Sequence, residues 1–381
     1  MRVCMISPHL APEQAANALL PRQLGDAPAS HEVITRYVAH PAAERAETQS
    51  TDEVTYVARR GRDGFSRTRA GALVAGSRMA AGARRSIRWS DLVHFHSNGL
   101  LIEVGRWLAA RYRKPYVITL YGTDVWHHDP ARHARFGRVV GGAACRVFYS
   151  QGLLDFAKDL GLAADPSVVI HAPVPAAFKA VDVDARRALR NELGVGGGPL
   201  LLTVKRLHPV AGHEELLRAM PAILHQRSDA ELWLVGEGEL RPALEALARD
   251  LGVASHVRFL GRVANEVLWR YSAAADLFVL PSRLESWGTV MLEALACGTP
   301  VFATVTVGAR EVQGQCPADV TLVEAGNPDA LAAAVGGRLR EARRTEAATL
   351  RVVRERFSPA RCAADYLRVY EDALGVRGAK R

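Results

Sequence analysis

Short apolar runs alternate with segments of helical periodicity along most of the chain. This alternation predicts parallel sheets whose strands are joined by crossover helices. In the first half of the chain the predicted strands are Val3–Ile6, Glu32–Val38, Val54–Val57, Leu92–His96, Tyr116–Leu120 and Arg146–Tyr149. In the second half they are Leu200–Val204, Glu231–Val235, Val257–Leu260, Leu277–Leu280, Val301–Thr304 and Val320–Val323. We therefore predict an α/β protein with two doubly wound parallel sheets.

The domain boundary is predicted where this pattern fails. Helical periodicity is found at 100–111, 152–160, 213–226, 240–251, 263–273, 328–354 (with a break) and 358–374. Near Ala172, closely spaced prolines and a loss of periodicity indicate a linker between domains. We predict one domain over residues 1–175, a second over 176–357, and a terminal stretch 358–381 whose helix packs back onto the first domain. Because open parallel sheets bind ligands beyond the carboxyl ends of their strands, we expect the two domains to face a cleft lined by loops that follow strands.

Composition narrows the class of protein without changing this picture. A length of 381 residues fits two domains of ordinary size, and a hydrophobic content of 49% suffices for two cores. No apolar run reaches about 18 residues, and the N-terminal stretch lacks a signal-peptide pattern, so we expect a cytoplasmic protein. The five cysteines are scattered without a Cys-x-x-Cys pair, which argues against a disulfide framework and a zinc site.

The net charge of +9 is concentrated in one segment. Residues 59–88 hold nine arginines and a single acid, Asp63, around a weakly apolar helical pattern. One interpretation is a peripheral contact with the anionic inner face of a membrane, or with an anionic acceptor. The alternative is a solvated helix face that aids solubility. A nucleic-acid partner is not expected, because the segment lacks interleaved aromatic residues and a recognisable binding motif.

The candidate chemistry centres on residues 280–300, which read LPSRLESWGTVMLEALACGTP. Glu285 precedes Gly288 and a predicted helix, and Glu293 lies within that helix after seven intervening residues. The start of a helix presents unpaired N–H groups and a partial positive charge, so it suits a phosphate, and Gly288 allows close approach. Two carboxylates beside a phosphate would repel it, so we assign them to hydroxyl groups instead. The pattern therefore predicts a ligand with a diphosphate and many hydroxyls, which describes a nucleotide sugar.

Several segments of the second half also resemble one known family. They are VKRLHPVAGHEELLRA, ELWLVGEGEL, VRFLGRV, ADLFVLPSRLESWGTVMLEALACGTPV and the FSPARC tail, in that order. Together they resemble retaining glycosyltransferase family 4, in which two Rossmann-like domains form the glycosyltransferase-B (GT-B) fold. The paired glutamates followed by ALACGTPV carry most of this specificity. The first half matches only weakly, through DLVHFHS and VITLYGTDV, as expected of a domain that varies with the acceptor.

The resemblance implies a role for each matching residue. Glu285 matches the glutamate implied to contact the transferred sugar and to stabilise positive charge at its anomeric carbon. Arg206 matches the arginine implied to neutralise the departing diphosphate, and Glu293 the glutamate implied to bind the ribose hydroxyls. The other implied donor-binding residues are Lys205, Gly236, Gly238, Arg262, Val263, Ser286, Trp287, Gly288 and Thr289. The implied reaction transfers a hexose-type sugar with retained anomeric configuration and without a metal or other cofactor, and family frequency favours a UDP-sugar as donor.

The chain departs from the family pattern at several positions. Lys205 replaces a glycine and Ala211 stands where a lysine is usual, so one of two diphosphate cations is absent from its usual place. Lys205 or His208 is the candidate substitute for it. In the first half, Ala15-Ala16 replaces a Gly-Gly pair, and Tyr121 replaces a histidine. These departures keep a non-catalytic nucleotide-sugar binder open as an alternative, whereas the paired glutamates oppose a nucleotide-sugar epimerase on the same fold.

Polar residues that follow predicted strands of the first half are the candidates for the acceptor site. We expect a lipid, glycan or small-molecule acceptor to be oriented by His96, Asn98, Tyr121, Thr123 and Asp124. His94 and His96 alternate on one strand, and three histidines follow at 127, 128 and 133, so a metal cluster is the alternative. The Asp-x-Asp sequence at 182–184 lies in the predicted linker, where solvation is the simpler interpretation. The pattern does not indicate the oligomeric state.

Overall fold

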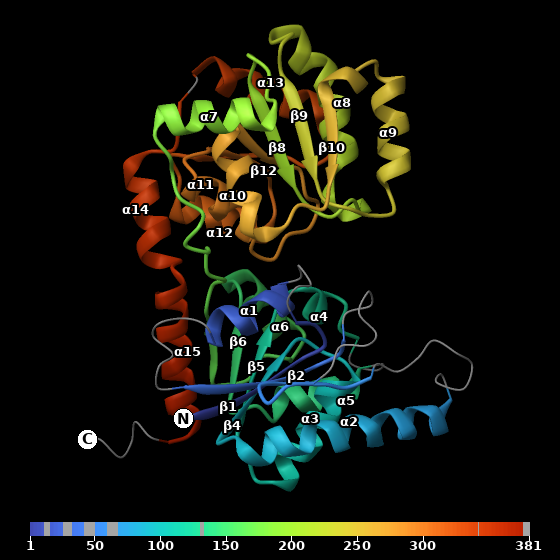
Figure 1. The fold of residues 1–381 in the computed structure, drawn as a ribbon. Coiled ribbons are helices and arrows are strands. Elements are labelled where there is room, and N and C mark those ends of the chain that lie inside the picture. The colour runs from blue at the N-terminus through green and yellow to red at the C-terminus, as the bar shows by residue number, and fades with distance from the viewer. Residues whose placement is uncertain are drawn as a thin grey trace. The chain divides into compact units, whose positions relative to one another are not determined.

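The computed structural model describes residues 1–10, 16–25, 33–41, 50–58, 68–129, 133–341 and 343–375. The chain divides into two compact units (Figure 1). The first unit comprises Met1–Pro173 together with Pro359–Arg381, and the second comprises Val174–Ser358. Each unit is an α/β structure around a parallel sheet of its own, so the predicted fold class is confirmed.

The first unit is built on a parallel sheet whose strands lie in the order β3-β2-β1-β4-β5-β6-β7. They are β1 (Arg2–Ser7), β2 (Ile34–Ala39), β3 (Val54–Tyr56), β4 (Leu92–His96), β5 (Tyr116–Leu120), β6 (Cys145–Phe148) and β7 (Ser167–Val169). Strands β4 and β5 are buried along their whole length, which explains why they read as continuous apolar runs. The pattern does not predict β7, because three residues carry too little periodicity. Position 32, included in the second predicted strand, lies outside the described residues.

Helices pack on the first sheet. They are α1 (Ala16–Gly25), α2 (Arg69–Trp89), α3 (Leu100–Arg111), α4 (Thr123–Trp126), α5 (Ala134–Gly141), α6 (Gln151–Asp159) and α15 (Pro359–Ala373). Helix α2 begins at an N-cap, where the Thr68 side chain accepts a hydrogen bond from the Gly71 N–H at 3.0 Å. Within the described ranges, no helix of either unit combines the length and apolarity needed to cross a bilayer.

The terminal helix α15 is fastened to the first sheet by buried hydrogen bonds. The Tyr370 hydroxyl lies 2.7 Å from His94 Nδ1, and His94 Nε2 lies 2.8 Å from the Thr119 hydroxyl. The Thr119 hydroxyl also lies 2.9 Å from the Tyr366 hydroxyl. Because buried polar groups need partners, this network stabilises a helix that is more than 240 residues away from its partners in sequence.

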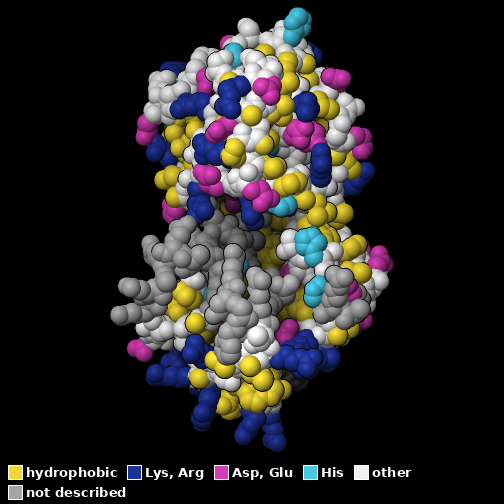
Figure 2. All heavy atoms as spheres, turned by 90° about the vertical axis from the view of Figure 1, so that its right-hand side faces the viewer, with side chains coloured by type: hydrophobic (Ala, Val, Ile, Leu, Met, Phe, Trp, Pro, Cys, Tyr) yellow, Lys and Arg dark blue, Asp and Glu magenta, His cyan; other side chains and the backbone are white. Residues whose placement is uncertain are grey.

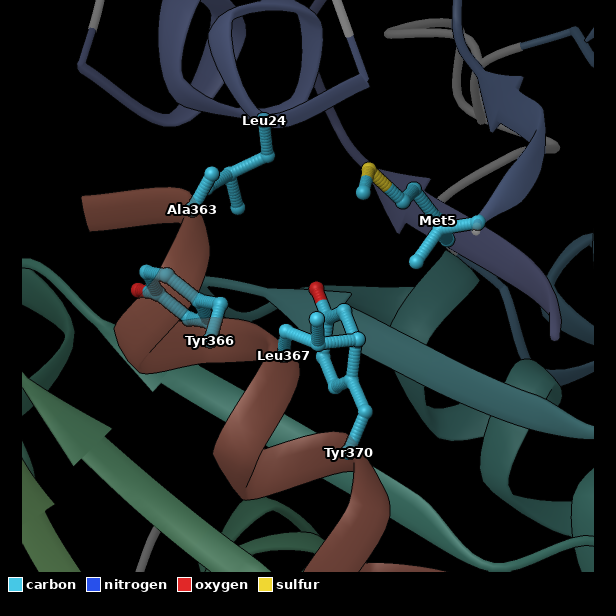
Figure 3. Close-up of a pocket in the computed structure, with 7 residues that line it drawn as sticks. Met5, Leu24, Ala363, Tyr366, Leu367 and Tyr370 are labelled. Atoms are coloured by element: carbon cyan, nitrogen blue, oxygen red, sulfur yellow. The ribbon is translucent and has the colours of Figure 1, made fainter. Parts of the chain in front are cut away.

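A small cavity lies beneath α15 in the first unit (Figure 3). Its lining is mostly apolar and consists of Met5, Leu24, Val33, Ala363, Tyr366, Leu367 and Tyr370. Its volume of about 10 Å³ is close to the minimum that holds one water molecule. Among the described residues, this space is too small to enclose a sugar or a nucleotide.

The second unit contains a parallel sheet in the order β10-β9-β8-β11-β12-β13. Its strands are β8 (Leu200–Val204), β9 (Glu231–Val235), β10 (Val257–Gly261), β11 (Leu277–Leu280), β12 (Val301–Thr304) and β13 (Val320–Val323). Its α-helices are α7 (Val183–Leu193), α8 (His213–Gln226), α9 (Arg241–Asp250), α10 (Asn265–Ala274), α11 (Thr289–Ala296), α12 (Val307–Gln315), α13 (Pro328–Glu341) and α14 (Ala347–Arg356). The predicted strands of this half agree with the observed ones to within one residue. The four central strands are buried apolar runs with at most one partly exposed residue, whereas the edge strands β10 and β13 are partly exposed.

Helix α7 is absent from the predicted elements, which place its first residues in a linker. In the structure Asp182 is the N-cap of this helix, and its carboxylate accepts a hydrogen bond from the Ala185 N–H at 2.8 Å. Asp184 lies in the first turn, where the positive end of the helix dipole stabilises a negative charge. The Asp-x-Asp sequence is therefore a helix start, and its interpretation as solvated linker is corrected.

Candidate functional site

The strand order of the second sheet indicates where a ligand should bind. The chain runs from β8 outward to β9 and β10 on one side, then returns to β11 on the other side of β8. Open sheets of this kind bind ligands at the carboxyl edge, at the point where the order reverses. Here that point lies between β8 and β11, so the loops at 205–212 and 281–288 flank it. Both loops carry residues that the sequence assigns to the donor.

Gly288 forms the start of helix α11. Its φ of +78° lies in the left-handed region, and a Cβ there would lie 2.5 Å from Met291 Cε and 3.1 Å from Glu285 Cγ. The position therefore favours glycine on both counts. Thr289 is the first helical residue, and no side-chain hydrogen bond caps this end in the described part of the chain. The backbone N–H groups at this end form a seat suited to an anion.

The backbone around Ser286 and Trp287 is held by the start of helix α12. The Gly308 N–H donates to the Glu285 carbonyl at 3.0 Å, and a Cβ on Gly308 would lie 2.6 Å from the Trp287 nitrogen. The Trp287 ring is itself buried and lies 5.5 Å from the ring of Phe357. Trp287 thus anchors the turn in the core, and only its backbone is available to a ligand.

Glu285 is ion-paired across the switch point. Its Oε2 lies in contact with Nζ of Lys205, which directly follows strand β8. The Glu285 side chain is 11% exposed and that of Lys205 is 25% exposed. The pair is therefore largely shielded from water, so it is stronger than a surface ion pair.

Arg206 and the two glycines after β9 lie beside this pair. The Arg206 side chain is exposed and forms no ion pair with any described residue. A Cβ on Gly236 would lie 2.1 Å from the Lys205 carbonyl oxygen, and one on Gly238 would lie 2.1 Å from that of Leu207. The loops after β8 and β9 thus approach backbone to backbone, which any larger residue would prevent.

The residues after β10 adjoin the same edge. The Gly236 N–H donates to the Gly261 carbonyl at 2.8 Å, and Arg262 and Val263 follow Gly261 directly. The structure therefore brings the residues assigned to the base beside the glycine loop.

Glu293 lies one turn beyond Thr289, the first residue of helix α11. Most of its surface is buried, and no cation pairs with it among the described residues. Burial raises the pKa of its carboxyl to about 7, because desolvation disfavours the charged form. Near neutral pH this group both donates and accepts hydrogen bonds, which suits it to sugar hydroxyls.

His213, which the sequence reasoning missed, lies near the same edge at the start of helix α8. Its ring is buried, and neither ring nitrogen has a hydrogen-bond partner within the described structure. Burial, followed by the positive charge of Lys205, lowers the pKa of His213 to about 4. The residue is therefore neutral at pH 7. The only sequence signal is its place after Gly212, at the start of a predicted helix.

The acceptor-site candidates follow β4 and β5 in the first unit, beside that sheet's own reversal point between β1 and β4. His96 is buried, its Nδ1 lies 2.7 Å from the Tyr121 hydroxyl, and burial lowers its pKa to about 3. Asn98 and Thr123 are exposed. Asp124 is buried, and its carboxylate accepts hydrogen bonds from the N–H groups of Tyr121 (3.0 Å) and Gly122 (2.8 Å), so it holds the turn.

The histidines lie in two pairs: the ring centroids of His94 and His96 are 3.9 Å apart, and those of His128 and His133 are 5.7 Å apart. His94 belongs to the hydrogen-bond network under α15, and the Asp129 N–H donates to His133 Nδ1 at 2.9 Å. The described ranges contain no group of three His, Cys, Asp or Glu side chains arranged to hold a metal ion. Of the Ala15-Ala16 pair, Ala16 begins α1 and Ala15 lies outside the described residues.

Comparison with known families gives two matches. The family model described as Glycosyltransferase Family 4 matches residues 22–178, and the model described as Glycosyl transferases group 1 matches residues 198–341. Together the two models account for most of both units.

Two curated relatives illustrate the similarity. A D-inositol 3-phosphate glycosyltransferase of Xylanimonas cellulosilytica is 33% identical over 338 residues, which cover 79% of this chain and 76% of that protein. A GDP-mannose-dependent alpha-(1-6)-phosphatidylinositol monomannoside mannosyltransferase of Mycolicibacterium smegmatis is 38% identical over 177 residues. That alignment covers 44% of this chain and only 46% of the mannosyltransferase, less than half of either protein.

Solved structures share the fold. Sucrose-phosphate synthase from Thermosynechococcus elongatus superposes with a TM-score of 0.79 at 19% identity, covering 99% of this chain and 100% of that one. HepE of Anabaena, solved with UDP, gives a TM-score of 0.77 at 18% identity, covering 97% and 100%. At such identities the likeness establishes the architecture and nothing about substrates.

Proposed function

The chain belongs to glycosyltransferase family 4, and from this we propose that it transfers a sugar from a nucleoside diphosphate sugar to an acceptor hydroxyl. One observation carries the proposal. Three features meet at the reversal point of one sheet: the start of α11, which has no side-chain cap, the Glu285 carboxylate, and the adjacent cations Lys205 and Arg206. An anion seat, a carboxylate and two cations there match a ligand with both a diphosphate and a sugar.

We assign the donor as follows. The diphosphate lies at the start of α11, contacting the backbone N–H groups of residues 286–289, and the exposed guanidinium of Arg206 neutralises the leaving phosphate. Glu293, one turn along the same helix, binds the ribose hydroxyls. Gly236 and Gly238 let the nucleotide approach the sheet edge, and Arg262 and Val263 contact the base.

GDP-mannose is the first donor to test. Three relatives that are 36 to 39% identical to parts of this chain are named as GDP-mannose-dependent. Family frequency favours a UDP-sugar instead, and the residues after β10 do not by themselves select a base. Thermal-shift measurements with GDP, UDP and ADP separate these donors, because a ligand that binds the native state raises its melting temperature.

The proposed reaction retains the anomeric configuration. The acceptor hydroxyl attacks from the face that the diphosphate leaves, through an oxocarbenium-like transition state that Glu285 stabilises. The leaving phosphate accepts the proton of the acceptor hydroxyl, so this mechanism needs neither a side-chain base nor a metal ion. NMR analysis of the product's anomeric configuration tests the stereochemistry directly.

The acceptor is proposed to be a phosphorylated polyol or a lipid headgroup that carries one. The printed names of the relatives include inositol phosphate and phosphatidylinositol mannoside acceptors. In the first unit, Asn98 and Thr123 are the exposed candidates, whereas His96 and Asp124 hold the surrounding turn. We therefore propose that Asn98 and Thr123 contact the acceptor and that His96 orients Tyr121.

Helix α2 is the proposed contact with an anionic membrane. Five arginines on it are exposed: Arg69, Arg78, Arg84, Arg85 and Arg88. Leu73, which is 73% exposed, and Val74 add apolar surface at its N-terminal end. Figure 2 shows Lys and Arg side chains gathered at the end of the first unit where Figure 1 draws α2. Residues 59–67 of the predicted basic segment lie outside the described residues.

A donor hydrolysis and transfer assay tests the proposal. Turnover of GDP-mannose or a UDP-hexose by the wild-type chain, abolished by Glu285→Ala, supports the transferase. Saturable nucleotide-sugar binding without turnover across lipid, inositol phosphate and glycan acceptors supports the alternative of a non-catalytic binder, which the uncharged Ala211 favours.

A further inference from the structure

The proposed donor seat has an unbalanced charge. A diphosphate brings about two negative charges to the start of α11, and Glu285 adds a third in a side chain that is largely withdrawn from water. Like charges in such surroundings repel strongly unless a cation lies between them. The exposed guanidinium of Arg206 balances part of this charge, so a second cation is required.

Three other basic side chains of the loops and helices around this edge are already engaged by carboxylates, and Arg262 is the residue assigned to the base. The Arg283 guanidinium donates to Glu215 at 2.8 Å, and that of Arg241 donates to Glu245 at 2.8 Å. His208, the alternative substitute for the cation absent at 211, accepts a bond from the Val210 N–H and lies 3.7 Å from Glu239. These groups are tied to positions away from Glu285. Lys205, whose partner is Glu285 itself, remains.

Lys205 is held at this place by the backbone. Its N–H donates to the Val235 carbonyl at 3.0 Å, and Gly236 packs against its carbonyl oxygen. The loop that contains Lys205 is hydrogen-bonded to the loop that contains Glu285, because the Arg283 N–H donates to the Val210 carbonyl at 2.8 Å. The two backbones also pack closely at Gly212, where an added Cβ would lie 1.8 Å from the Pro281 carbonyl oxygen. The pairing of Lys205 with Glu285 therefore follows from the fold and not from a chance meeting of surface chains.

We propose that Lys205 is a bridging residue that links Glu285 to the donor diphosphate. In the empty site its ammonium neutralises Glu285. When the donor binds, its three N–H donors are shared between the Glu285 carboxylate and a phosphate oxygen. Lys205 thus supplies the second cation beside Arg206 and keeps the carboxylate turned toward the sugar. This inference rests on the proposed function, whose donor it concerns.

The inference predicts opposite effects for the two members of the pair. Lys205→Met leaves the charge of Glu285 unbalanced, so GDP and UDP should bind about tenfold more weakly. Glu285→Gln frees the ammonium for the phosphate, so the same nucleotides should bind severalfold more tightly even though transfer is lost. Lys205→Arg keeps the charge and should bind within about threefold of wild type.

Isothermal titration with GDP and UDP measures these affinities, and circular dichroism verifies folding. Arg218→Met is the matched control, because it removes a cation of the same unit whose partner, Glu214, is exposed on helix α8, and it should leave the affinity unchanged. If Lys205 only holds Glu285, Lys205→Met lowers turnover without changing nucleotide affinity, and the inference is overturned.

The other possible results also decide whether Lys205 has the bridging role. If Lys205→Met does not fold, Glu285→Gln, which preserves side-chain shape, carries the test alone, and an affinity that does not rise overturns the inference. If the wild-type chain binds neither GDP nor UDP nor ADP, the proposed function fails and this inference fails with it. Unchanged affinity in Lys205→Met refutes the bridging role alone.

Discussion

Replacing Gly288 by alanine should damage the proposed donor seat in two separable ways. The first is conformational, because a φ of +78° costs a residue with a Cβ about 1 kcal/mol relative to glycine. The second is steric, because the added Cβ would lie 2.5 Å from Met291 Cε and 3.1 Å from Glu285 Cγ. The methionine end can swing away, but the contact with Glu285 requires the carboxylate-bearing side chain to move.

Gly194 provides the matched control. It is the C-cap of α7 in the same unit, its φ is +68°, and no atom lies within 4 Å of a Cβ built there. Gly194→Ala should therefore lose about 1 kcal/mol of unfolding free energy through backbone strain alone. Gly288→Ala should lose about 2 kcal/mol, because displacement of Met291 and Glu285 adds to the same strain.

The functional readout separates the two effects further. A displaced Glu285 should reduce sugar transfer by at least about tenfold in Gly288→Ala, whereas Gly194→Ala should retain wild-type transfer. Urea unfolding gives the stabilities, and initial rates with the preferred nucleotide sugar give the activities. Equal losses of stability in the two variants, together with wild-type turnover in Gly288→Ala, would refute the role assigned to this turn.

Three further predictions concern other parts of the chain. The pKa of Glu293 is raised to about 7 in the folded protein from an ordinary value of 4.5, so the folded state holds this proton more tightly than the unfolded state. The stability that this provides is fully present below pH 4.5 and is lost as the pH rises through 7. Glu293→Gln should remove this loss, which urea unfolding at about pH 5 and about pH 8 measures. Tyr370→Phe should lower the unfolding free energy by about 1 to 3 kcal/mol, because it leaves buried His94 without one partner, and nucleotide affinity should stay unchanged. Arg84→Glu with Arg85→Glu should reduce sedimentation with anionic phosphatidylglycerol vesicles and leave turnover of a water-soluble acceptor intact; equal sedimentation of both proteins would count against α2 as the membrane contact.

The central strands of the second unit could be predicted because burial on both faces leaves a continuous apolar run. Leu277–Leu280 and Val301–Thr304 are buried at every residue, and turn residues bound each run. Helix α7 could not be predicted in the same way, since the preceding prolines and its polar, mostly exposed surface resemble a linker. What reveals it is the Asp182 cap, a signal that is local and easily mistaken for solvation.

In the candidate site, backbone features could be predicted from the sequence more readily than contacts between side chains. Gly288 could be assigned from the residues themselves, because the start of a helix makes a local demand on the backbone, whereas Gly236 and Gly238 are implied only by the family resemblance. The structure shows that these two glycines allow close approach to the loop after β8. The pairing of Lys205 with Glu285 could not be predicted, because 80 residues separate them and only the strand order brings β8 beside β11. The lysine that the family pattern places at 211 and the one this chain carries at 205 flank a single loop whose ends are both fixed to neighbouring strands. Ala211 taken alone favours the non-catalytic binder, but a charge carried at 205 lies on the same loop beside the same proposed site, so the transferase remains our proposal.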